Sequence, residues 1–398
     1  MKIALLNNLY EPYNRGGAEK VVKIMAEELK KSGHEIFIIT TEPSFKKQRS
    51  KKTKKQFNNA TIEQSTKIYH INSSYYNLNS IPKALRFFWH LSDMFSLRKY
   101  FTIRKILKRE KPDLAITHNL KGLGFLAPLA LKKSRIKHIH YLHDIQLLHP
   151  SGLMFAGQER IINTLTAKIY QFFNHRLFDS PAIIISPSHW LMELHSKFFS
   201  NSKKIILPNP TAVQKTEEVK KENEIFNWLF VGQIEKHKGI FFLLEAFKKY
   251  PDQNCSLTIV GDGSQSEAIR ALAKEDSRIK IEPWPGDSAL KKYLNQADCL
   301  IMPSLCYENS PTIIYDSATV GLPVIASDLG GIPELSNVFG GLLFAPGNEK
   351  DLLSKMAEIK KDQELRQKCK TQSLAKLKDY DLKIYLEKIN KIISANNS

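Results

Sequence analysis

Two acids with a polar segment between them are the part of this sequence best suited to chemistry. Glu308 and Asp316 stand eight positions apart in the 398-residue chain, and Asn309, Ser310 and Pro311 directly follow the first acid. Serine followed by proline is typical of a helix start, with serine as the N-cap and proline at the first helical position. Because the first turn of a helix has unpaired N–H groups, this segment predicts a polar crevice that both acids can face.

Two apolar runs flank this segment and predict the strands that position it. Residues 298–304 (DCLIMPS) and 322–327 (LPVIAS) have the length and composition of buried parallel strands. In open α/β sheets, ligands bind at the carboxyl ends of such strands. We therefore expect Glu308, Asn309 and Ser310 at a ligand-binding edge of a sheet, beside a helix N-terminus.

The amino-terminal residues predict a second strand–loop–helix unit. Residues 2–8 indicate a strand, residues 18–33 an amphipathic helix and residues 34–41 the next strand. Gly16 and Gly17 lie where the loop meets the helix, so their N–H groups are available to a phosphate. No G-x-G-x-x-G fingerprint of a dinucleotide site is present.

Strands and helices alternate through both halves of the chain, which predicts an α/β fold with parallel sheets and right-handed crossovers. In the first half, residues 113–118, 138–144 and 181–186 indicate strands. The second half starts again with a strand at residues 228–231. Between the halves, a Pro-Asn-Pro sequence and a polar, charged run over residues 204–224 predict a domain boundary.

Neither the histidines nor the cysteines have the pattern of a metal site. His138, His140, His143 and His149 lie within twelve residues, and the first two share a strand face. Spaced cysteine and carboxylate ligands are missing from this cluster, so we expect no metal site. The scattered cysteines contain no C-x-x-C pair and indicate neither zinc nor a disulfide framework, and therefore a reducing compartment; they are Cys255, Cys299, Cys306 and Cys369.

The two acids, their neighbours and the run PVIASDLGGIPE over residues 323–334 together resemble the signature of the retaining nucleotide-sugar glycosyltransferases of family four. The resemblance implies the GT-B fold, in which two Rossmann-like domains face each other across a cleft and a C-terminal helix crosses back to the first domain. On this basis we predict an acceptor-binding domain at residues 1–205, a donor-binding domain at 206–379, and residues 380–398 packed on the first domain.

The family implies a role for each matching residue. Glu308 matches the acid that touches the donor sugar, and Asp316 the acid that holds the ribose hydroxyls, where the family usually has glutamate. His143 resembles a histidine that faces the donor sugar and the acceptor, and Lys238 matches a lysine in the loop after the first strand of the donor domain. The implied catalytic residues are His143, Lys238 and Glu308, and the implied donor-binding residues are Arg15, Gly16, Gly17, Gln233, Lys238, Glu308, Asn309, Ser310, Pro311, Thr312 and Asp316.

One position departs from the family in charge. Gln233 stands where the family has an arginine, and it can donate hydrogen bonds but carries no charge. Arg15, directly before the paired glycines, is a candidate to supply the missing cation, and Lys236 is the competing candidate. We expect no metal and no other cofactor, because Lys238 and helix N-termini can stabilise the charge of a departing diphosphate.

The positive charge of the chain is confined to one half. The chain has 59 Lys and Arg against 40 Asp and Glu, a formal net charge of +19. Residues 1–204 hold 34 of these cations and 14 of the acids, whereas residues 205–398 hold 25 and 26. Such a field attracts nucleic acid or the anionic face of a membrane. Because no nucleic-acid-binding motif accompanies the charge, we expect no nucleic-acid partner.

Two basic segments of the first half are candidates for membrane contact. Residues 41–59 contain KKQRSKKTKK and predict a solvated loop. Residues 82–110 form a long helical pattern in which aromatic and basic residues alternate. Such a helix either lies on an anionic bilayer or packs on the sheet of its own domain, and the sequence leaves both open.

Taken together, these features predict a glycosyltransferase that moves a sugar from a nucleotide-sugar donor to a glycan or lipid-linked acceptor in cell-surface polysaccharide synthesis. The alternative is a catalytically weakened member that only binds nucleotide or glycan, which Gln233 and Asp316 favour. No apolar run approaches the ~18 residues of a spanning helix, and residues 1–8 are too short an apolar stretch for a signal peptide. We expect a cytoplasmic protein, peripheral to the inner face of the membrane.

Overall fold

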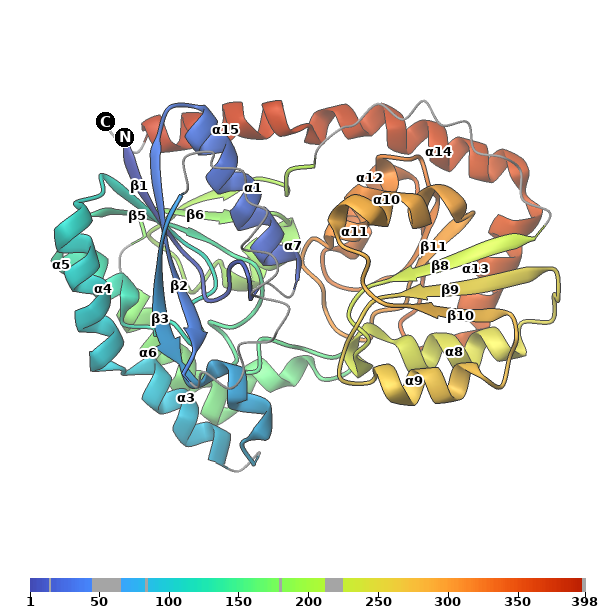
Figure 1. Ribbon diagram of the computed structural model, residues 1–398, viewed down its shortest axis with the longest axis horizontal. Coiled ribbons are helices and arrows are strands. Elements are labelled where there is room, and N and C mark those ends of the chain that lie inside the picture. The colour runs from blue at the N-terminus through green and yellow to red at the C-terminus, as the bar shows by residue number, and fades with distance from the viewer. Residues whose placement is uncertain (14–15, 45–65, 83–84, 179–180, 212–224, 396–398) are drawn as a thin grey trace.

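The chain folds into two lobes, each built on a parallel β-sheet (Figure 1). The structure is a computed structural model that describes residues 1–13, 16–44, 66–82, 85–178, 181–211 and 225–395. The basic run within residues 41–59 and the polar run before residue 225 lie largely outside these ranges. All strand pairs that join the named strands are parallel, as the alternation of strands and helices predicts.

The N-terminal lobe contains a seven-stranded sheet in the order β3-β2-β1-β4-β5-β6-β7. Its strands are β1 (Lys2–Leu6), β2 (Glu35–Pro43), β3 (Lys67–Ser73), β4 (Leu114–Thr117), β5 (Lys137–Tyr141), β6 (Ile183–Ser186) and β7 (Lys203–Ile206). Its helices are α1 (Gly17–Lys31), α3 (Arg86–Met94), α4 (Leu97–Glu110), α5 (Ala127–Lys133), α6 (Leu165–Phe178) and α7 (His189–His195), with short 3₁₀ turns η2 (Ser74–Ser80) and η4 (Glu159–Asn163).

The C-terminal lobe contains a six-stranded sheet in the order β10-β9-β8-β11-β12-β13. Its strands are β8 (Phe226–Val231), β9 (Cys255–Val260), β10 (Ile279–Glu282), β11 (Cys299–Met302), β12 (Val324–Ser327) and β13 (Leu342–Phe344). Its helices are α8 (Ile240–Lys249), α9 (Ser266–Ala273), α10 (Asp287–Gln296), α11 (Thr312–Ala318), α12 (Ile332–Phe339), α13 (Glu349–Lys361) and α14 (Gln363–Leu377), with the 3₁₀ turns η5 (Lys236–Lys238) and η6 (Lys378–Tyr380).

Each sheet is covered on both faces, as expected for fully apolar parallel strands. In the N-terminal lobe, α1 covers one face together with the last helix, α15 (Leu382–Ala395), and α4 to α7 cover the other. In the C-terminal lobe, α8, α9 and α13 pack on one face and α10 to α12 on the other. The four cysteines are buried and none forms a disulfide.

The strand order places one switch point in each sheet. In the N-terminal lobe the order reverses between β1 and β4, and in the C-terminal lobe it reverses between β8 and β11. Connections leave in opposite directions at such a point, so a crevice opens beyond the carboxyl ends of the strands, where ligands bind. The loops after β8 and β11 carry Lys238 and Glu308, which the sequence marked for the donor site.

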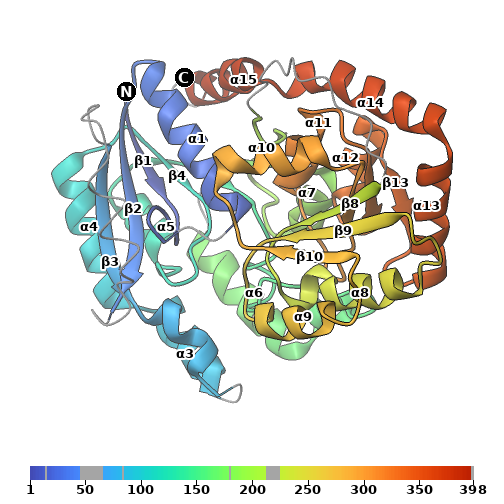
Figure 2. The same ribbon diagram turned by 45° about the vertical axis from the view of Figure 1, so that its right-hand side comes forward.

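The last helix returns to the first lobe. Figures 1 and 2 show α14 and α15 running along the same side of both lobes, with α15 lying over the N-terminal lobe. Tyr385, Ile389, Ile392 and Ile393 of α15 are buried in the same apolar cluster as α1 and β1. The predicted GT-B architecture with a returning helix is therefore confirmed, whereas the predicted boundaries at residues 205 and 379 remain a prediction.

The predicted single helix over residues 82–110 is wrong in one respect, because the structure divides it into α3 and α4. Ser96, between them, has an extended backbone with ψ of 93° and is the N-cap of α4. An extended residue cannot continue the helical hydrogen-bond pattern, so the chain turns there. The break allows α4 to bury Ile103 and Leu107 while much of α3 lies at the surface.

Replacing Ile389 with alanine should destabilise the N-terminal lobe. Ile389 is fully buried between α15 and the sheet, and removing such a side chain leaves a cavity that costs about 2–5 kcal/mol. Amide hydrogen exchange should therefore quicken in β1 and α1 and stay unchanged in β8. Exposed Lys388 in the same helix provides the control, Lys388→Ala. Equal exchange in the two variants would show that α15 does not stabilise this lobe.

Candidate active site

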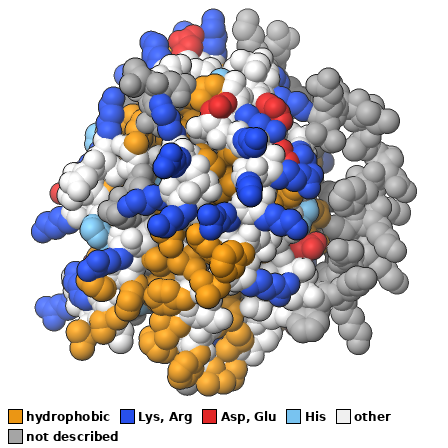
Figure 3. All heavy atoms as spheres, turned by 90° about the vertical axis from the view of Figure 1, so that its left-hand side faces the viewer, with side chains coloured by type: hydrophobic (Ala, Val, Ile, Leu, Met, Phe, Trp, Pro, Cys, Tyr) orange, Lys and Arg blue, Asp and Glu red, His pale blue; other side chains and the backbone are white. Residues whose placement is uncertain are grey.

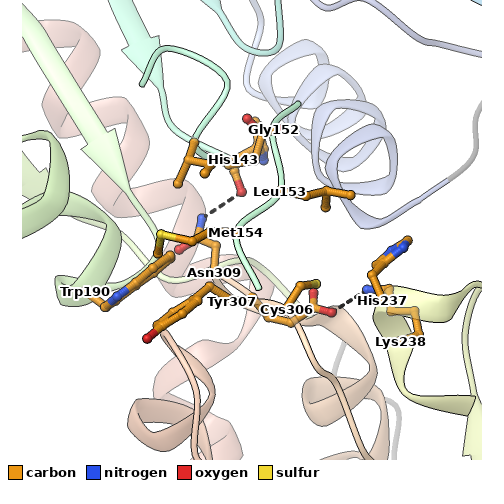
Figure 4. Close-up of a pocket in the computed structure, with 13 residues that line it drawn as sticks. His143, Gly152, Leu153, Met154, Trp190, His237, Lys238, Cys306, Tyr307 and Asn309 are labelled. Atoms are coloured by element: carbon orange, nitrogen blue, oxygen red, sulfur yellow. Dashed lines mark hydrogen bonds and ion pairs between the residues drawn. The ribbon is translucent and has the colours of Figure 1, made fainter. Parts of the chain in front are cut away.

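A pocket lies where the two lobes meet at the carboxyl ends of their strands (Figure 4). One wall comes from the N-terminal lobe, in the segment after β5 and at the start of α7, and the other from the loops after β8 and β11. The lining residues are His143, Asp144, Ile145, Gly152, Leu153, Met154, Trp190, His237, Lys238, Cys306, Tyr307, Glu308 and Asn309. The three residues predicted to be catalytic are thus brought together.

Lys238 and Glu308 form an ion pair in this pocket. Lys238 Nζ lies 2.5 Å from Glu308 Oε1, and Ser304 donates a hydrogen bond of 2.9 Å to the same carboxylate oxygen. The side chains are only 26% and 15% exposed, so both charges are partly removed from water. The pair joins the two loops that flank the switch point of the C-terminal sheet.

The pair keeps both of its members charged. Burial by itself would raise the pKa of Glu308, but the Lys238 ammonium and the hydrogen bonds hold that pKa below its ordinary value. Burial likewise would lower the pKa of Lys238, but the Glu308 carboxylate keeps it above the ordinary value. At neutral pH Lys238 and Glu308 therefore present one fixed cation and one fixed anion to the pocket.

Two glycines hold the Glu308 loop in place. Gly331 donates its N–H to Glu308 O at 2.8 Å, and Gly330 pairs with Glu308 as an isolated parallel bridge. A Cβ on Gly331 would lie 1.8 Å from Asn309 O, so no other residue allows this approach. The Gly-Gly of the sequence motif thus positions Glu308 and Asn309 through backbone contact.

His143 enters the pocket in its neutral form. Burial lowers its pKa to about 3. Its Nε2 lies 2.9 Å from Nδ1 of His118, and burial also lowers the pKa of His118, so one neutral ring donates to the other. Nδ1 of His143 makes no hydrogen bond to a described residue. His118 directly follows β4. The sequence alone does not indicate its role, because its partner His143 follows a different strand, β5.

Asp144 is a further titratable group in the pocket wall, directly after His143 and part of the same His-Asp pair that matches the family. Burial raises its pKa to about 6, although the backbone N–H of Gln146 donates to Oδ1 at 2.7 Å. Its charge state therefore changes just below neutral pH.

Two other histidines of the cluster, His138 and His140, do not line the pocket. Both contact Thr117 Oγ1, through His138 Nε2 at 2.6 Å and through His140 Nδ1 at 2.8 Å.

The paired glycines face the C-terminal lobe directly. A Cβ on Gly16 would lie 3.8 Å from Nε2 of Gln233, and one on Gly17 would lie 3.1 Å from Cγ2 of Thr312. The predicted opposition of the glycine loop and the donor loops is present. One expected donor is already used, because the Gly16 N–H donates to Oε2 of Glu19 at 2.6 Å at the start of α1.

Asp316 is paired with a lysine from the other lobe. Lys20 Nζ of α1 lies 2.8 and 2.9 Å from the two carboxylate oxygens of Asp316 on α11. The side chains are 30% and 21% exposed. Sequence reasoning did not mark Lys20, which follows the paired glycines by three residues and belongs to the exposed side of an amphipathic helix. Its partner is 296 residues away.

Ser310 and Pro311 differ from the prediction. The N-cap of α11 is Pro311, and no side chain caps the helix. The hydroxyl of Ser310 instead contacts the Tyr315 hydroxyl at 2.7 Å, and Asn209 donates to Ser310 O at 3.0 Å. Ser310 is buried, so its side chain anchors the start of α11 internally. The expectation that Ser310 caps this helix was wrong.

Other predicted residues lie nearby or outside the described chain. Asn309 donates to His143 O at 3.2 Å and accepts from Ser188 Oγ at 2.6 Å, so it joins the lobes (Figure 4 shows the first contact). Lys236 is exposed. Arg15 lies outside the described residues. Within the described ranges, no group of three or more His, Cys, Asp or Glu side chains could hold a metal ion.

Glu334, the last residue of the Gly-Gly-Ile-Pro-Glu motif, holds the lobes together. From α12 it accepts hydrogen bonds from the backbone N–H groups of His189 at 2.8 Å and Trp190 at 2.7 Å. These N–H groups open α7, where the helix has no internal acceptors for them. The ring of Trp190 stacks on Tyr307 with centroids 5.4 Å apart. A carboxylate of one lobe thus caps a helix of the other.

Two Rossmann-like sheets that face each other across a pocket, with a helix returning to the first lobe, place this protein in the GT-B class of transferases. Residues 15–215 match the sequence profile described as Glycosyltransferase Family 4, and residues 210–375 match Glycosyl transferases group 1. The chain belongs to glycosyltransferase family 4, and it is a retaining glycosyltransferase.

Relatives named as glycosyltransferases match most of the chain. It is 23% identical to the putative teichuronic acid biosynthesis glycosyltransferase TuaC of Bacillus subtilis over 387 residues, 91% of this chain and 90% of the relative. It is 22% identical to the UDP-Gal:alpha-D-GlcNAc-diphosphoundecaprenol alpha-1,3-galactosyltransferase of Escherichia coli over 306 residues, 72% and 75% of the two chains. Anabaena HepE in complex with UDP superposes with a TM-score of 0.72 at 15% identity, covering 99% of this chain and all of that one, which supports the fold.

Replacing Lys238 with methionine should change how the free energy of unfolding depends on pH. Wild-type Glu308 contributes stability above the unfolded pKa of its carboxyl, and this is lost as the pH falls through the lowered folded pKa. In Lys238→Met the cation is gone, so burial raises the pKa of Glu308. The free energy of unfolding should therefore fall by about 1–3 kcal/mol at neutral pH, and part of this loss should be recovered toward about pH 5 as Glu308 becomes protonated. Urea unfolding over a pH series measures this, and Lys238→Met with Glu308→Gln should remove most of the deficit. A deficit independent of pH contradicts the ion-pair interpretation.

Replacing Glu334 with alanine should favour separation of the lobes. The variant loses two hydrogen bonds to a carboxylate, each worth about 1.5–3 kcal/mol. Small-angle scattering should show a larger radius of gyration, with Glu334→Gln intermediate because an amide retains only one accepting oxygen. Exposed Glu193 of α7 gives the control, Glu193→Ala. If Glu334→Ala keeps the wild-type radius, closure does not depend on this cap.

Proposed function

We propose that the protein transfers a sugar from a nucleotide-sugar to a glycan or lipid-linked acceptor, with retention of anomeric configuration, in the synthesis of a cell-surface polysaccharide. The observation that carries the proposal is the Lys238–Glu308 pair, held at the switch point of the donor lobe and facing His143 across the pocket. The teichuronic acid biosynthesis relative and the galactosyltransferase that acts on a diphosphoundecaprenol-linked sugar support the glycan and lipid-linked acceptor classes. UDP in the related HepE makes uridine donors the first to test.

Lys238 is the group that acts on the leaving diphosphate. Breaking the bond from sugar to phosphate develops negative charge on the departing oxygens, and a fixed cation in a partly dry pocket lowers that barrier. The ammonium is prepared for this because Glu308 keeps it charged despite its burial. Glu308 in turn accepts hydrogen bonds from hydroxyl groups of the sugar and holds it in position, while the leaving phosphate takes the proton of the acceptor.

His143 and Asp316 complete the proposed donor site. His143 is neutral, so its remaining ring nitrogen forms a hydrogen bond with a sugar hydroxyl without adding charge. Asp316 accepts hydrogen bonds from the ribose hydroxyls. Its side chain is shorter than the glutamate usual in the family, and its contact with Lys20 keeps the carboxylate oriented toward the cleft. Gly16 and Gly17 allow the backbone of the acceptor lobe to approach the diphosphate closely.

The alternative, a weakened member that binds without efficient turnover, is favoured by Gln233. This neutral amide stands opposite the paired glycines, where the family has an arginine. With one cation fewer at the diphosphate, binding and orientation persist while the barrier to bond breaking stays higher. The two proposals therefore differ in turnover and agree on nucleotide binding.

Incubation of the protein with UDP- and GDP-sugars, with and without lipid-linked acceptors, tests the proposal. We expect transfer or slow donor hydrolysis, and Lys238→Ala should lower kcat/KM for the donor by about 10²–10³-fold. Lys274→Ala, which changes an exposed lysine of the same lobe, serves as the control. Nucleotide binding without turnover would identify the weakened module, and the absence of both binding and turnover would overturn the proposal.

A further inference from the structure

The N-terminal lobe exposes an apolar face on three of its helices that no described element covers. We define the apolar face by the exposed hydrophobic side chains of α3, α4, α6 and the α3–α4 turn, together with Leu85 directly before α3, which are between 36% and 77% exposed. They are Leu85, Phe87, Phe88, Phe95, Leu97, Phe101, Leu165, Ile169, Phe172 and Phe173. Figure 3 shows hydrophobic side chains gathered over this side of the molecule, with Lys and Arg side chains beside them.

The face is continuous across helices distant in sequence. The ring of Phe95, between α3 and α4, packs edge-on against Phe173 of α6, with centroids 5.4 Å apart. Contiguous exposed apolar surface of this kind marks an interaction site, whereas single exposed hydrophobic residues need no explanation. Helix α6 is apolar on both sides, because Ala167 and Phe178 are buried while Leu165, Ile169 and Phe172 face outward.

The charge beside this face has one sign. The acids within α3, α4 and α6 are Asp93 and Glu110, and both are buried and paired with lysines. The exposed charged residues of the same helices, His175 aside, are all cations: Arg98, Arg104, Lys105, Lys108, Arg109, Lys168 and Arg176. The Arg176 guanidinium lies 5.3 Å from the centre of the Phe172 ring, so apolar and cationic groups alternate closely. This pattern complements a surface that is apolar inside and anionic outside.

We propose that the apolar face of α3, α4 and α6 docks on an anionic phospholipid bilayer, with its aromatic side chains among the acyl chains and its cations at the headgroups. Amphipathic helices bind anionic bilayers through this combination of apolar burial and electrostatic attraction. A second copy of this chain fits poorly, because a two-fold interface would place these cations against one another without acids between them. None of the described helices has the length and apolarity needed to cross a bilayer, so docking would be peripheral.

Helix α6 connects this surface to the pocket. On its inner side, Tyr170 donates to Gln146 O at 2.8 Å and Asn174 donates to Leu147 O at 3.0 Å. These carbonyls belong to the segment that directly follows His143 and Asp144 in the pocket wall. A lipid-linked acceptor would therefore reach the cleft from the membrane to which α6 is bound. This last step rests on the proposed function, whereas the docking itself does not.

Vesicle flotation of the full chain tests the docking. Wild type should bind phosphatidylcholine vesicles that contain about one-third phosphatidylglycerol, bind pure phosphatidylcholine more weakly, and lose affinity as salt is raised. Phe88→Ser with Phe172→Ser, and separately Arg104→Gln with Lys105→Gln, should each lower the partition coefficient about tenfold or more. The matched controls change exposed residues of the C-terminal lobe, Ile225→Ser with Trp284→Ser and Lys274→Gln with Lys280→Gln, and should stay within about twofold.

Two outcomes would overturn the docking proposal. The first is that the variant Phe88→Ser with Phe172→Ser keeps both the vesicle affinity and the melting temperature of the wild type. The second is that light scattering finds a wild-type dimer that this variant converts to a monomer, which assigns the face to a second copy. UDP binding measured without lipid separates the proposals: binding with no vesicle association contradicts the docking alone, and vesicle association with no nucleotide binding contradicts the proposed function alone.

Discussion

The contact between Lys238 and Glu308 is the interaction on which the site depends. Neither charge would be stable alone at this depth, because burial lowers the pKa of a lysine and raises that of a glutamate. Together they remain charged and neutralise each other, so the pair is stable without a ligand. A diphosphate that enters would offer the ammonium a second anion and release part of the carboxylate to bind hydroxyl groups. The resting structure thus stores a cation in a form that a dianionic ligand can recruit.

The lobes are joined by polar contacts around this pair. Asn309 contacts both His143 O and Ser188, Glu334 caps α7, and Lys20 reaches Asp316. Because these contacts are polar and do not form a large apolar interface, relative motion of the two lobes is expected. By contrast, α15 is attached to the first lobe by buried apolar side chains and therefore remains part of that lobe. The arrangement lets the cleft open while the connection between lobes persists.

Much of the fold and the centre of the site could be predicted from the sequence, because short apolar runs and motif spacing are local signals. The strands before Lys238 and Glu308 and the loops that carry these residues are examples. Contacts between distant segments could not be predicted in this way. Lys20 has an ordinary place on an amphipathic helix, and His118 follows a strand that gives no sign of His143 as its neighbour. Ser310 shows the opposite error, because a strong local cap signal was outweighed by a hydroxyl partner, Tyr315, one helical turn away.

The uneven charge of the chain can be understood from the demands on each lobe. On the proposed function, the C-terminal lobe releases a nucleotide diphosphate after each turnover, and modest charge favours this release because excess cations would hold the product and slow its departure. The C-terminal half is nearly neutral, with 25 cations and 26 acids, and its partly buried cation in the pocket, Lys238, is balanced by Glu308. The N-terminal half has no such limit away from the pocket. Its cations on α4 and α6 lie on the outside of the sheet, with Asp93 and Glu110 buried beneath them. A long-range attraction can therefore act on that surface without raising the affinity of the site for its own leaving group.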